Sequence, residues 1–364
     1  MRELKVELGE RSYPIYIGEG ILEQIGSFFA KHHIGKASPL LIVTDEYVAK
    51  HHLAIVETKL REEGYTVASY IVASGEKSKS LSVLEKVVAA ALEAGLDRKS
   101  TVIALGGGVV GDLAGFVAAS YMRGVRFVQV PTTILAHDSS VGGKVAVNHP
   151  MAKNIIGAFH QPEMVVYDTA TLRTLPDREV RAGLSEMIKH GLIWDADFTA
   201  WMEENASKLI SLDQEALQYG LYMGCKVKSI VVSQDEKEND LRAILNLGHT
   251  IGHALEAVSG YNELLHGEAI SIGMVGSAKL ALRLGYPEHI YTVTKRILQA
   301  YGLPTRLSQH LNTDDIMSAM LHDKKFMEGN MVFIVPTEIG KVEINKNISS
   351  AWVREIVEEL KQEA

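Results

Sequence analysis

Short apolar runs recur along the first half of the chain and are separated by longer amphipathic stretches. The runs lie at residues 40–43, 68–72, 101–105 and 127–130, and a helical pattern at 81–94 separates two of them. Strands that are apolar on both faces and alternate with helices are typical of βαβ units on a buried parallel sheet. The pattern therefore predicts an α/β architecture for the first half.

Long amphipathic segments dominate from about Asp177 onward, and strand-like runs are scarce until residues 331–335. The segments span residues 179–193, 213–232, 249–258 and 268–284. Amphipathic stretches of this length indicate helices. The second half is therefore expected to be mostly helical.

The length of the chain, 364 residues, exceeds what one hydrophobic core usually accommodates. Residues 161–176, with a proline near each end, lie where the α/β pattern gives way to the helical one. We therefore expect residues 1–176 to form an α/β domain with a mostly parallel sheet. Residues 177–364 are expected to form a mainly α-helical domain.

Composition limits the classes of partner. Hydrophobic residues make up 46% and charged residues 23%, which is ordinary for a folded globular protein. The single cysteine, Cys225, excludes an intramolecular disulfide framework, so that any bound metal must rely on histidines and carboxylates. A net charge of -8 provides no basic surface for nucleic acid, and neither a signal peptide nor a membrane span is evident. We expect a cytoplasmic protein with a small-molecule ligand and with no nucleic acid or membrane partner.

A glycine-rich loop follows the apolar run at 101–105. Residues 106–112 read Gly-Gly-Gly-Val-Val-Gly-Asp, which fits the G-x-G-x-x-G pattern of dinucleotide-binding loops. In a standard Rossmann unit an acidic residue ends the next strand, but here that strand ends in Pro-Thr-Thr at 131–133. An acidic strand end occurs upstream instead, at Asp45. The loop indicates a dinucleotide on a Rossmann-like sheet of non-standard strand order, and the alternative is a tight turn without a ligand.

Histidines and carboxylates recur at helical spacing in the second half. Asn246, His249 and His253 are three and four residues apart, so a helix would place all three on one face. Glu186 lies in another predicted helix, and His266 lies where a loop meets the next one. Two histidines and one carboxylate with an open position are a normal composition for a catalytic Zn²⁺ site. The alternative is a hydrogen-bonded pair of histidines without metal, and spacing alone does not say which histidine would bind.

Several cations suit a doubly anionic small molecule. Lys144 follows the glycine-containing segment 138–143, and Lys153 precedes Asn154 nearby. Further candidates are Arg123, Lys189, Lys228, Arg242, Lys324 and Lys325. Lysine and arginine in glycine-rich loops bind phosphate or carboxylate groups, although any one of them could instead be a solvated surface charge.

Taken together, these blocks closely resemble 3-dehydroquinate synthases. The blocks are residues 106–118, 131–133, 138–144, 153–159, 186–189, 242–256 and 266–274. The resemblance runs from about Asp45 to Lys325, with two local departures. Residues 135–138 read Leu-Ala-His-Asp in place of the common Ala-Gln-Val-Asp form, and 145–147 read Val-Ala-Val in place of the frequent Thr-Gly-Ile.

The resemblance implies an NAD-binding α/β domain, a helical domain that carries Zn²⁺ or Co²⁺, an active site in the cleft and a homodimer. It implies the metal ligands Glu186, His249 and His266. NAD would be held by Asp45, Glu76, Lys79, Gly107, Gly108, Asp112, Thr132, Thr133 and Lys153. The catalytic residues would be Lys144, Asn154, Lys189, Arg242, Asn246 and His253, with His253 binding substrate or relaying protons. Further substrate contacts would come from Arg123, Asp138, Lys228 and the pair Lys324 and Lys325.

The implied reaction converts 3-deoxy-D-arabino-heptulosonate 7-phosphate to 3-dehydroquinate and phosphate. Its steps would be transient oxidation by NAD, phosphate elimination, reduction, ring opening and intramolecular aldol closure. The alternatives are a metal-requiring polyol or glycerol dehydrogenase, a sister sugar-phosphate cyclase, and a non-catalytic binding protein. Two features argue against a dehydrogenase. One is Glu186 as the candidate metal ligand, and the other is the set of cations around Lys144, which a neutral polyol would not need.

Overall fold

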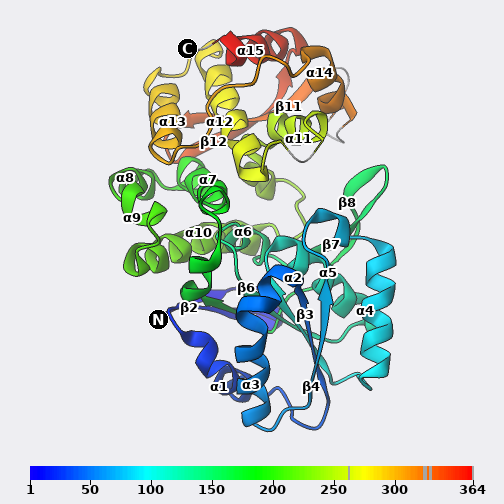
Figure 1. The fold of residues 1–364 in the computed structure, drawn as a ribbon. Helices are drawn as coiled ribbons and strands as arrows, with labels where there is room; N and C mark the ends of the chain where they lie inside the picture. The colour runs from blue at the N-terminus through cyan, green and yellow to red at the C-terminus, as the bar shows by residue number, and fades with distance from the viewer. Residues whose placement is uncertain (261–262, 323–325, 328–329, 363–364) are drawn as a thin grey trace. The chain divides into compact units, whose positions relative to one another are not determined.

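The chain forms two compact units (Figure 1). The computed structural model describes residues 1–260, 263–322, 326–327 and 330–362. The first unit contains Met1–Leu175 and Leu217–Lys237, and the second contains Pro176–Ala216 and Glu238–Ala364. The chain passes from the first unit to the second at Pro176, close to the expected boundary. Residues 217–237 return to the first unit, so neither unit is a continuous stretch of sequence. The division into domains at 1–176 and 177–364 stays a prediction.

A seven-stranded sheet organises the first unit. Its strand order is β1-β2-β9-β6-β5-β3-β4, and all neighbouring strands are parallel except β1 and β2. The strands are β1 (Arg2–Val6), β2 (Tyr13–Gly18), β3 (Leu40–Asp45), β4 (Val67–Val72), β5 (Thr101–Gly106), β6 (Arg126–Pro131) and β9 (Met164–Asp168). The predicted α/β class with a mostly parallel sheet of non-standard order is confirmed.

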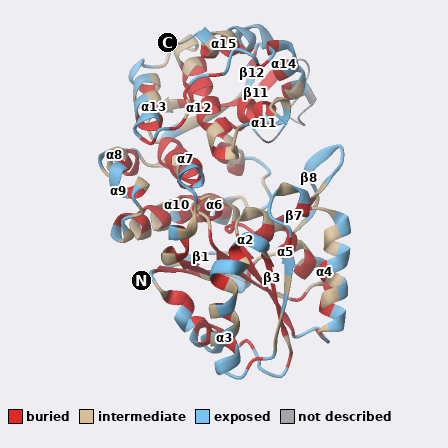
Figure 2. Ribbon diagram, viewed as in Figure 1, coloured by how far each residue is buried: buried red, intermediate tan, exposed pale blue. Residues whose placement is uncertain are grey.

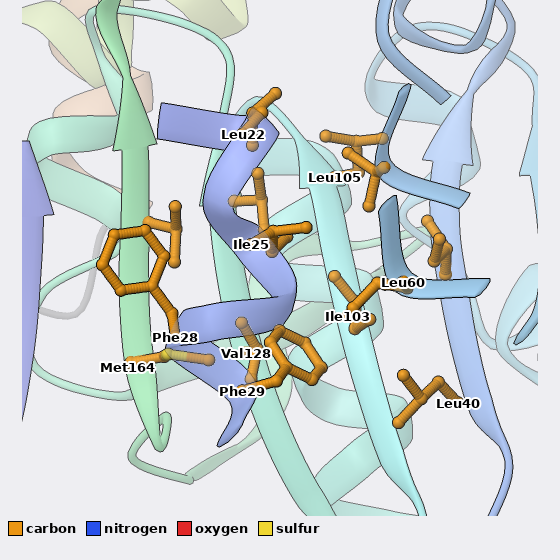
Figure 3. Packing of buried hydrophobic residues seen from close by; sticks show 14 of the residues in the cluster. Leu22, Ile25, Phe28, Phe29, Leu40, Leu60, Ile103, Leu105, Val128 and Met164 are labelled. Carbon is orange, nitrogen blue, oxygen red and sulfur yellow. The ribbon is translucent and has the colours of Figure 1, made fainter. Parts of the chain in front are cut away.

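Helices cover both faces of this sheet because its central strands are apolar on both sides. In β3, Leu40 and Ile42 pack into one core, and Leu41 and Val43 pack into another. The first core also holds residues of η2, α1 and α3, as Figure 3 shows in part, and the second holds residues of α4 and α5. Figure 2 shows β3 buried along its length, whereas α4 exposes its outer face. The parallel sheet is therefore a buried middle layer.

The remaining elements of the first unit are short helices, one hairpin and one long helix. The 3-10 helices are η1 (Gly9–Arg11), η2 (Ile21–Gln24), η4 (Glu76–Ser78), η5 (Tyr121–Arg123) and η6 (Thr169–Thr174), and η3 (Ala49–Leu53) is a π-helical turn. The α-helices are α1 (Ile25–Lys31), α2 (Glu46–Val48), α3 (Ala54–Glu62), α4 (Leu81–Glu93), α5 (Gly108–Ser120) and α6 (Ala136–Ser139), and α10 (Gln214–Gln234) begins just before the unit's second segment. Strands β7 (Lys144–His149) and β8 (Ala152–Phe159) pair in an antiparallel hairpin.

Residues 161–176, which the sequence indicated as the connection between the two halves, include regular secondary structure. They contain β9, all of whose residues are buried, and η6. Strand β9 pairs in parallel with β2 and β6, so its backbone hydrogen bonds lie inside the sheet. A run of five residues flanked by loop-like sequence is too short to identify from its periodicity alone.

The second unit is mainly helical in its described part. Its helices are α7 (Asp177–Trp194), α8 (Ala196–Glu204), α9 (Ala206–Ile210), η7 (Leu241–Asn246), α11 (His249–Val258), α12 (His266–Arg283), α13 (His289–Ala300), α14 (Thr313–His322) and α15 (Ser350–Gln362). Strands β10 (Phe326–Met327), β11 (Asn330–Glu338) and β12 (Lys341–Ile348) form an antiparallel sheet. Helix α12 is buried along most of its length and packs against α7, α11, α13 and α15. Among the helices that the structure describes, none has the length and hydrophobicity needed to cross a bilayer.

Candidate functional site

The carboxyl ends of β3, β5 and β6 bring candidate NAD-binding residues to one edge of the sheet, since these strands are parallel and adjacent. Asp45 ends β3 and caps α2 by accepting hydrogen bonds from the backbone N–H groups of Tyr47 (2.8 Å) and Val48 (3.0 Å). Ser74 donates a third bond of 3.0 Å to the same carboxylate oxygen, Oδ1. These contacts hold the carboxylate in one orientation at the end of the strand.

The glycine loop runs from β5 directly into α5. A Cβ atom on Gly107 would lie 2.9 Å from Cγ2 of Thr133, so the loop packs closely against the segment after β6. The backbone N–H of Thr132 donates to the carbonyl of Gly106 (3.1 Å), which fixes the same approach. Glycine at 107 is therefore needed for packing. The arrangement places Gly107 and Gly108 at the start of a helix, where N–H groups and the helix dipole favour an anion.

Lys79 links candidate cofactor and substrate residues. Its buried ammonium forms an ion pair with Asp112 and donates a hydrogen bond to the side-chain oxygen of Asn154. The sequence did not single out Asn148, which connects the group further. Its amide donates to Glu76 (2.7 Å), and its oxygen accepts from the backbone N–H of Asn154 (2.9 Å). The structure thus joins Glu76, Lys79, Asp112 and Asn154 in one polar network.

Asp138 and Lys228 also meet within the first unit. The ammonium of Lys228, on α10, lies 2.9 Å from Oδ2 of Asp138 and also donates to the backbone carbonyl of Asp138. The residue before Asp138, His137, packs against α10, where a Cβ atom on Gly224 would lie 2.6 Å from the histidine ring. Beside this contact, burial raises the pKa of the Cys225 thiol to about 12, so it stays protonated at neutral pH.

Three other candidate cations of the first unit are exposed. Lys144 starts β7 directly after Gly142 and Gly143, whose φ angles of 95° and 65° favour glycine. Lys153 lies on β8, and Arg123 ends η5 with a left-handed φ of 70°. The structure places each cation on a defined turn or strand, and their roles stay predictions.

The second unit brings Glu186, His249 and His266 together. Nε2 of His249 lies 3.7 Å from Oε1 of Glu186, and Nε2 of His266 lies 3.5 Å from the same oxygen. One ligand atom of each residue lies within 4.8 Å of the others. Glu186 is 1% exposed and also forms an ion pair with Lys189, one helical turn along α7.

This geometry fits a divalent metal. Two ligands each about 2.1 Å from a tetrahedral ion lie about 3.4 Å apart, close to the two distances measured from Glu186. Ligating histidines usually hold their other ring nitrogen against an acceptor. Nδ1 of His249 lies 3.1 Å from the carbonyl of Leu247, and Nδ1 of His266 lies 3.0 Å from Oε2 of Glu256. Both histidines therefore turn Nε2 towards Glu186, as ligation by Zn²⁺ or Co²⁺ requires.

The two histidines differ in protonation. Burial, with the nearby charge of Lys189, lowers the pKa of His249 well below its usual value. Burial also lowers the pKa of His266, but hydrogen bonds to Glu186 and Glu256 outweigh burial and raise this pKa to about 10. In the absence of metal, His249 is therefore neutral and His266 carries a proton at neutral pH.

Backbone contacts at glycines set the spacing of the ligand-bearing helices. A Cβ atom on Gly267 would lie 1.9 Å from the carbonyl oxygen of Ala182, so the start of α12 touches the backbone of α7. A Cβ atom on Gly273 would lie 1.9 Å from the carbonyl oxygen of Gly248, so α12 also touches the chain just before α11. No side chain separates the helices at these points, which brings His266 and His249 to Glu186.

A carboxylate and an arginine fix the start of α12. Glu268 accepts a hydrogen bond of 2.8 Å from the backbone N–H of Leu265 and forms two bonds of 2.7 Å with the guanidinium of Arg178, on α7. A glutamate that reaches back to the residue before a helix defines the helix end. His266 is consequently the first residue of α12, two residues before the start of the helical segment that the sequence predicted.

Asn246 does not lie on one helical face with His249 and His253, as a single helix through the three residues would have required. Asn246 ends η7, and α11 begins only at His249, because Gly248 adopts a left-handed φ of 80° between them. His253 does follow on α11, with its ring centroid 5.1 Å from that of His249. The amide of Asn246 donates to Glu238 (3.1 Å).

The remaining predicted site residues are Arg242, Lys324 and Lys325. Arg242 lies in η7 and is buried. Lys324 and Lys325 lie outside the described residues. Sequence reasoning missed Glu238, which is one of several charged residues at 235–240 and gave no signal above an ordinary surface loop. It also missed Glu256, although that residue lies seven positions after His249 and hence on the same helical face.

Comparison with known proteins agrees with this geometry. The family models of the 3-dehydroquinate synthase N-terminal and C-terminal domains match residues 69–182 and 183–326. A 3-dehydroquinate synthase from Desulforamulus reducens is 51% identical, covering 96% of this chain and 98% of its own. One from Shewanella loihica is 45% identical, covering 98% of this chain and 99% of its own.

Solved structures of sugar cyclases share the fold. A 2-deoxy-scyllo-inosose synthase complexed with carbaglucose-6-phosphate, NAD⁺ and Co²⁺ is 27% identical, with a TM-score of 0.91, covering 98% of this chain and 100% of its own. The 2-epi-5-epi-valiolone synthase of Streptomyces hygroscopicus, with NAD⁺ and Zn²⁺ bound, is 26% identical, with a TM-score of 0.86, covering 97% of this chain and 98% of its own. An iron-containing alcohol dehydrogenase from Thermococcus thioreducens, at 18% identity and a TM-score of 0.71, shares the fold alone and covers 97% of this chain and 99% of its own.

Two family models that together span most of the chain, and relatives about half identical along nearly its whole length, show that the chain belongs to the 3-dehydroquinate synthase family.

Proposed function

We propose that this protein converts 3-deoxy-D-arabino-heptulosonate 7-phosphate to 3-dehydroquinate and phosphate, as a phosphate-eliminating lyase that uses NAD and Zn²⁺ or Co²⁺. The observation that carries the proposal is the convergence of Glu186, His249 and His266 at ligand distances, in a chain of this family. A non-catalytic protein on the same fold would be expected to lack one of these donors. All three are present.

The edge of the first sheet would bind NAD. The start of α5 at Gly107 and Gly108 offers backbone N–H groups to the pyrophosphate. Asp45, held through Oδ1, leaves Oδ2 to accept hydrogen bonds from ribose hydroxyls. Glu76, Lys79, Asp112, Thr132, Thr133 and Lys153 are the other proposed cofactor residues. Bound NAD would accept a hydride from the substrate and return it within one turnover.

Glu186, His249 and His266 would hold the metal, and their anionic and neutral donors leave a position open for substrate. The bound ion would act as a Lewis acid towards substrate oxygens. Lys189 keeps its ammonium beside Glu186, and this ion pair fixes the orientation of the carboxylate. The residues therefore present a preorganised ligand set.

A substrate with a phosphate and a carboxylate needs local cations, because the chain carries a net charge of -8. We assign this role to Lys144, Lys189, Lys228 and Arg242, with Arg123, Asp138, Asn154, Asn246, His253 and the pair Lys324 and Lys325 as further substrate contacts. Lys228 and Arg242 are buried, so their charges are fixed in place before substrate binds. A neutral polyol would gain nothing from them.

The test is phosphate release from the heptulosonate phosphate by the purified enzyme, with and without NAD. We expect release that depends on NAD and metal, a cyclic keto acid as product, and retention of deuterium placed at C5. NADH should not accumulate. Stoichiometric NADH formation would favour a dehydrogenase, and loss of the deuterium to solvent would favour a different order of steps. Turnover of another sugar phosphate alone would favour a sister cyclase.

The family resemblance also supports a homodimer as the functional state. Sedimentation equilibrium of the purified protein measures its mass directly. A mass of twice 39.9 kDa is the expected result, and a monomer at working concentrations contradicts it.

A further inference from the structure

Helix α11 directs two side chains of one face at two different helices. His249 faces Glu186 on α7, whereas Glu256, seven residues later, faces His266 on α12. The Glu256 side chain is 10% exposed, and its Oε2 lies 3.0 Å from Nδ1 of His266. Glu256 is not one of the three metal ligands, so the ligand set alone assigns it no role.

The two nitrogens of an imidazole ring point in different directions, so an acceptor at one nitrogen fixes where the other points. With Nδ1 held by Glu256, Nε2 of His266 lies 3.5 Å from Oε1 of Glu186. The two glutamates therefore contact different nitrogens of the same ring. Only the arrangement with hydrogen on Nδ1 leaves the Nε2 lone pair for a metal.

The other candidate ligand is oriented differently. Nδ1 of His249 contacts a backbone carbonyl, that of Leu247, and its side chain is 11% exposed. His266 is the first residue of its helix, and its side chain is 31% exposed. A ring at a helix start with more free surface has more rotamers available, so it depends more on a side-chain partner.

We propose that Glu256 is a positioning residue that fixes the tautomer and orientation of His266 and thereby sets the affinity of the site for its metal. The inference rests on the proposed function only in that it assumes a metal at Glu186, His249 and His266. Partners of this kind typically contribute 10- to 100-fold to metal affinity. Glu256 acts through His266 and does not bind the metal itself.

A second arrangement of the same atoms makes the opposite prediction. His253, Glu256 and His266 also offer ligand atoms within 4.8 Å of one another. A cation held there through Nδ1 of His266 would replace the hydrogen bond to Glu256. Such a site would add a second metal to each chain, whereas the proposal requires one.

The experiment measures the dissociation constants of Zn²⁺ and Co²⁺ for the metal-free full-length protein by competition with a chromogenic chelator. Glu256→Leu removes the acceptor, and Glu256→Gln keeps an amide oxygen that can accept from Nδ1. Glu263→Gln serves as the matched control, because Glu263 contacts His310 (3.0 Å) and lies outside the ligand set. The absorption spectrum of the Co²⁺-loaded protein reports the ligand geometry independently of activity.

We expect Glu256→Leu to weaken both metals by about 10- to 100-fold, Glu256→Gln to weaken them less, and Glu263→Gln to leave them unchanged. The Co²⁺ spectrum should change in Glu256→Leu, while the metal-free variant keeps a cooperative melting transition. Wild-type affinity in Glu256→Leu, or a second metal lost with Glu256, would overturn the proposal. If the wild-type protein binds no metal, the proposed function fails instead, so the two failures are distinguishable.

Discussion

Two histidines that face one carboxylate have opposite protonation states in the metal-free protein. Burial keeps His249 neutral, whereas Glu186 and Glu256 keep a proton on His266 by raising its pKa to about 10. With Nδ1–H donated to Glu256, the extra proton of His266 lies on Nε2, towards Glu186. It occupies the side of the ring that a metal would use.

Metal binding should therefore release a proton. The folded pKa of His266 is raised above the usual 6.5, so its imidazolium stabilises the metal-free fold fully below about pH 6.5 and stops doing so as the pH rises through about 10. Between these values the metal must displace the proton, and metal affinity should rise about tenfold per pH unit. Calorimetric titration at pH 8 in buffers of different ionisation enthalpy counts the released protons. We expect about one per metal from His266, and a count near zero contradicts the assignment.

Loss of any one ligand should remove the stabilisation that metal provides. At a metal concentration 100 times the dissociation constant, binding stabilises the folded protein by about 2.7 kcal/mol. Glu186→Gln, His249→Ala and His266→Ala should each abolish this rise in melting temperature and leave no metal after desalting. The control is His310→Ala, an exposed histidine that should keep the full effect. Full metal occupancy in the three variants would disprove the ligand set.

The sequence identified the metal ligands only in part. Helical spacing showed that His249 and His253 share a face, and the structure has both on α11. Spacing did not distinguish which of them faces Glu186, since that depends on how α7, α11 and α12 pack. The family resemblance supplied the choice. Asn148 stayed hidden for a similar reason, because its partners Glu76 and Asn154 meet it only through the β7–β8 hairpin.

At the scale of elements, glycines control the distances between helices. Helix α12 meets the chain before α11 where Gly273 faces Gly248, and it meets α7 where Gly267 faces Ala182. Helix interiors normally disfavour glycine by about 1 kcal/mol relative to alanine. Glycine at these positions indicates that the close backbone contact stabilises the fold by more than the loss of helix propensity destabilises it.

Gly273→Ala should destabilise the second unit despite its better helix propensity. The new methyl group would lie 1.9 Å from the carbonyl oxygen of Gly248, and backbone cannot move aside without displacing His249. We expect the free energy of unfolding to fall by about 3 kcal/mol or more, well above the gain of about 1 kcal/mol in propensity. Urea unfolding of the metal-free protein measures the change, and metal affinity should fall with it.

Gly276→Ala, on the same helix, is the matched control. Its methyl group would meet the end of the Ile251 side chain at 2.5 Å, which can rotate away. The loss of stability should be about 1 kcal/mol or less, because the propensity gain offsets part of it. Equal losses in the two variants would show that backbone contact at Gly273 is unimportant.

The elements that the sequence predicted are those with a strong pattern. The buried strands β3, β5 and β6 and the amphipathic helices α4, α7 and α12 were predicted to within a few residues of their ends. Strand β9 was missed because five residues show no period, and its place between β2 and β6 depends on partners distant in sequence. The segment predicted at 249–258 matches α11, but the spacing of Asn246 and His249 did not report the left-handed turn at Gly248 that separates them.

At the scale of the whole molecule, the first unit is assembled from two separated parts of the chain. The segment Leu217–Lys237 supplies Lys228 to Asp138 and packs Gly224 against His137. Near its end, Glu236 forms bonds of 2.5 and 2.7 Å with the guanidinium of Arg11. The α/β sheet therefore depends on a helix that follows part of the second unit.

A fragment of residues 1–176 should consequently lack cooperative unfolding. Without 217–237, the His137 ring loses its cover and Asp138 loses its ion pair. Thermal melting followed by circular dichroism should show a broad transition, with strong binding of a hydrophobic dye. A second fragment that joins 1–175 to 213–237 through a glycine–serine linker should restore a sharp transition. A cooperative, dye-silent melt of the shorter fragment would contradict the dependence on α10.

The split of the first unit also sets an order of events during synthesis. Ribosomes add roughly 5–20 residues per second, so the 41 residues from Pro176 to Ala216 delay the arrival of Leu217 by about 2–8 seconds. For that interval the nascent sheet has all its strands but lacks the helix that covers His137. Synthesis of the first unit thus starts before that of the second unit and ends after synthesis of the second unit has started. During this interval the nascent chain exposes the surface that a chaperone would recognise.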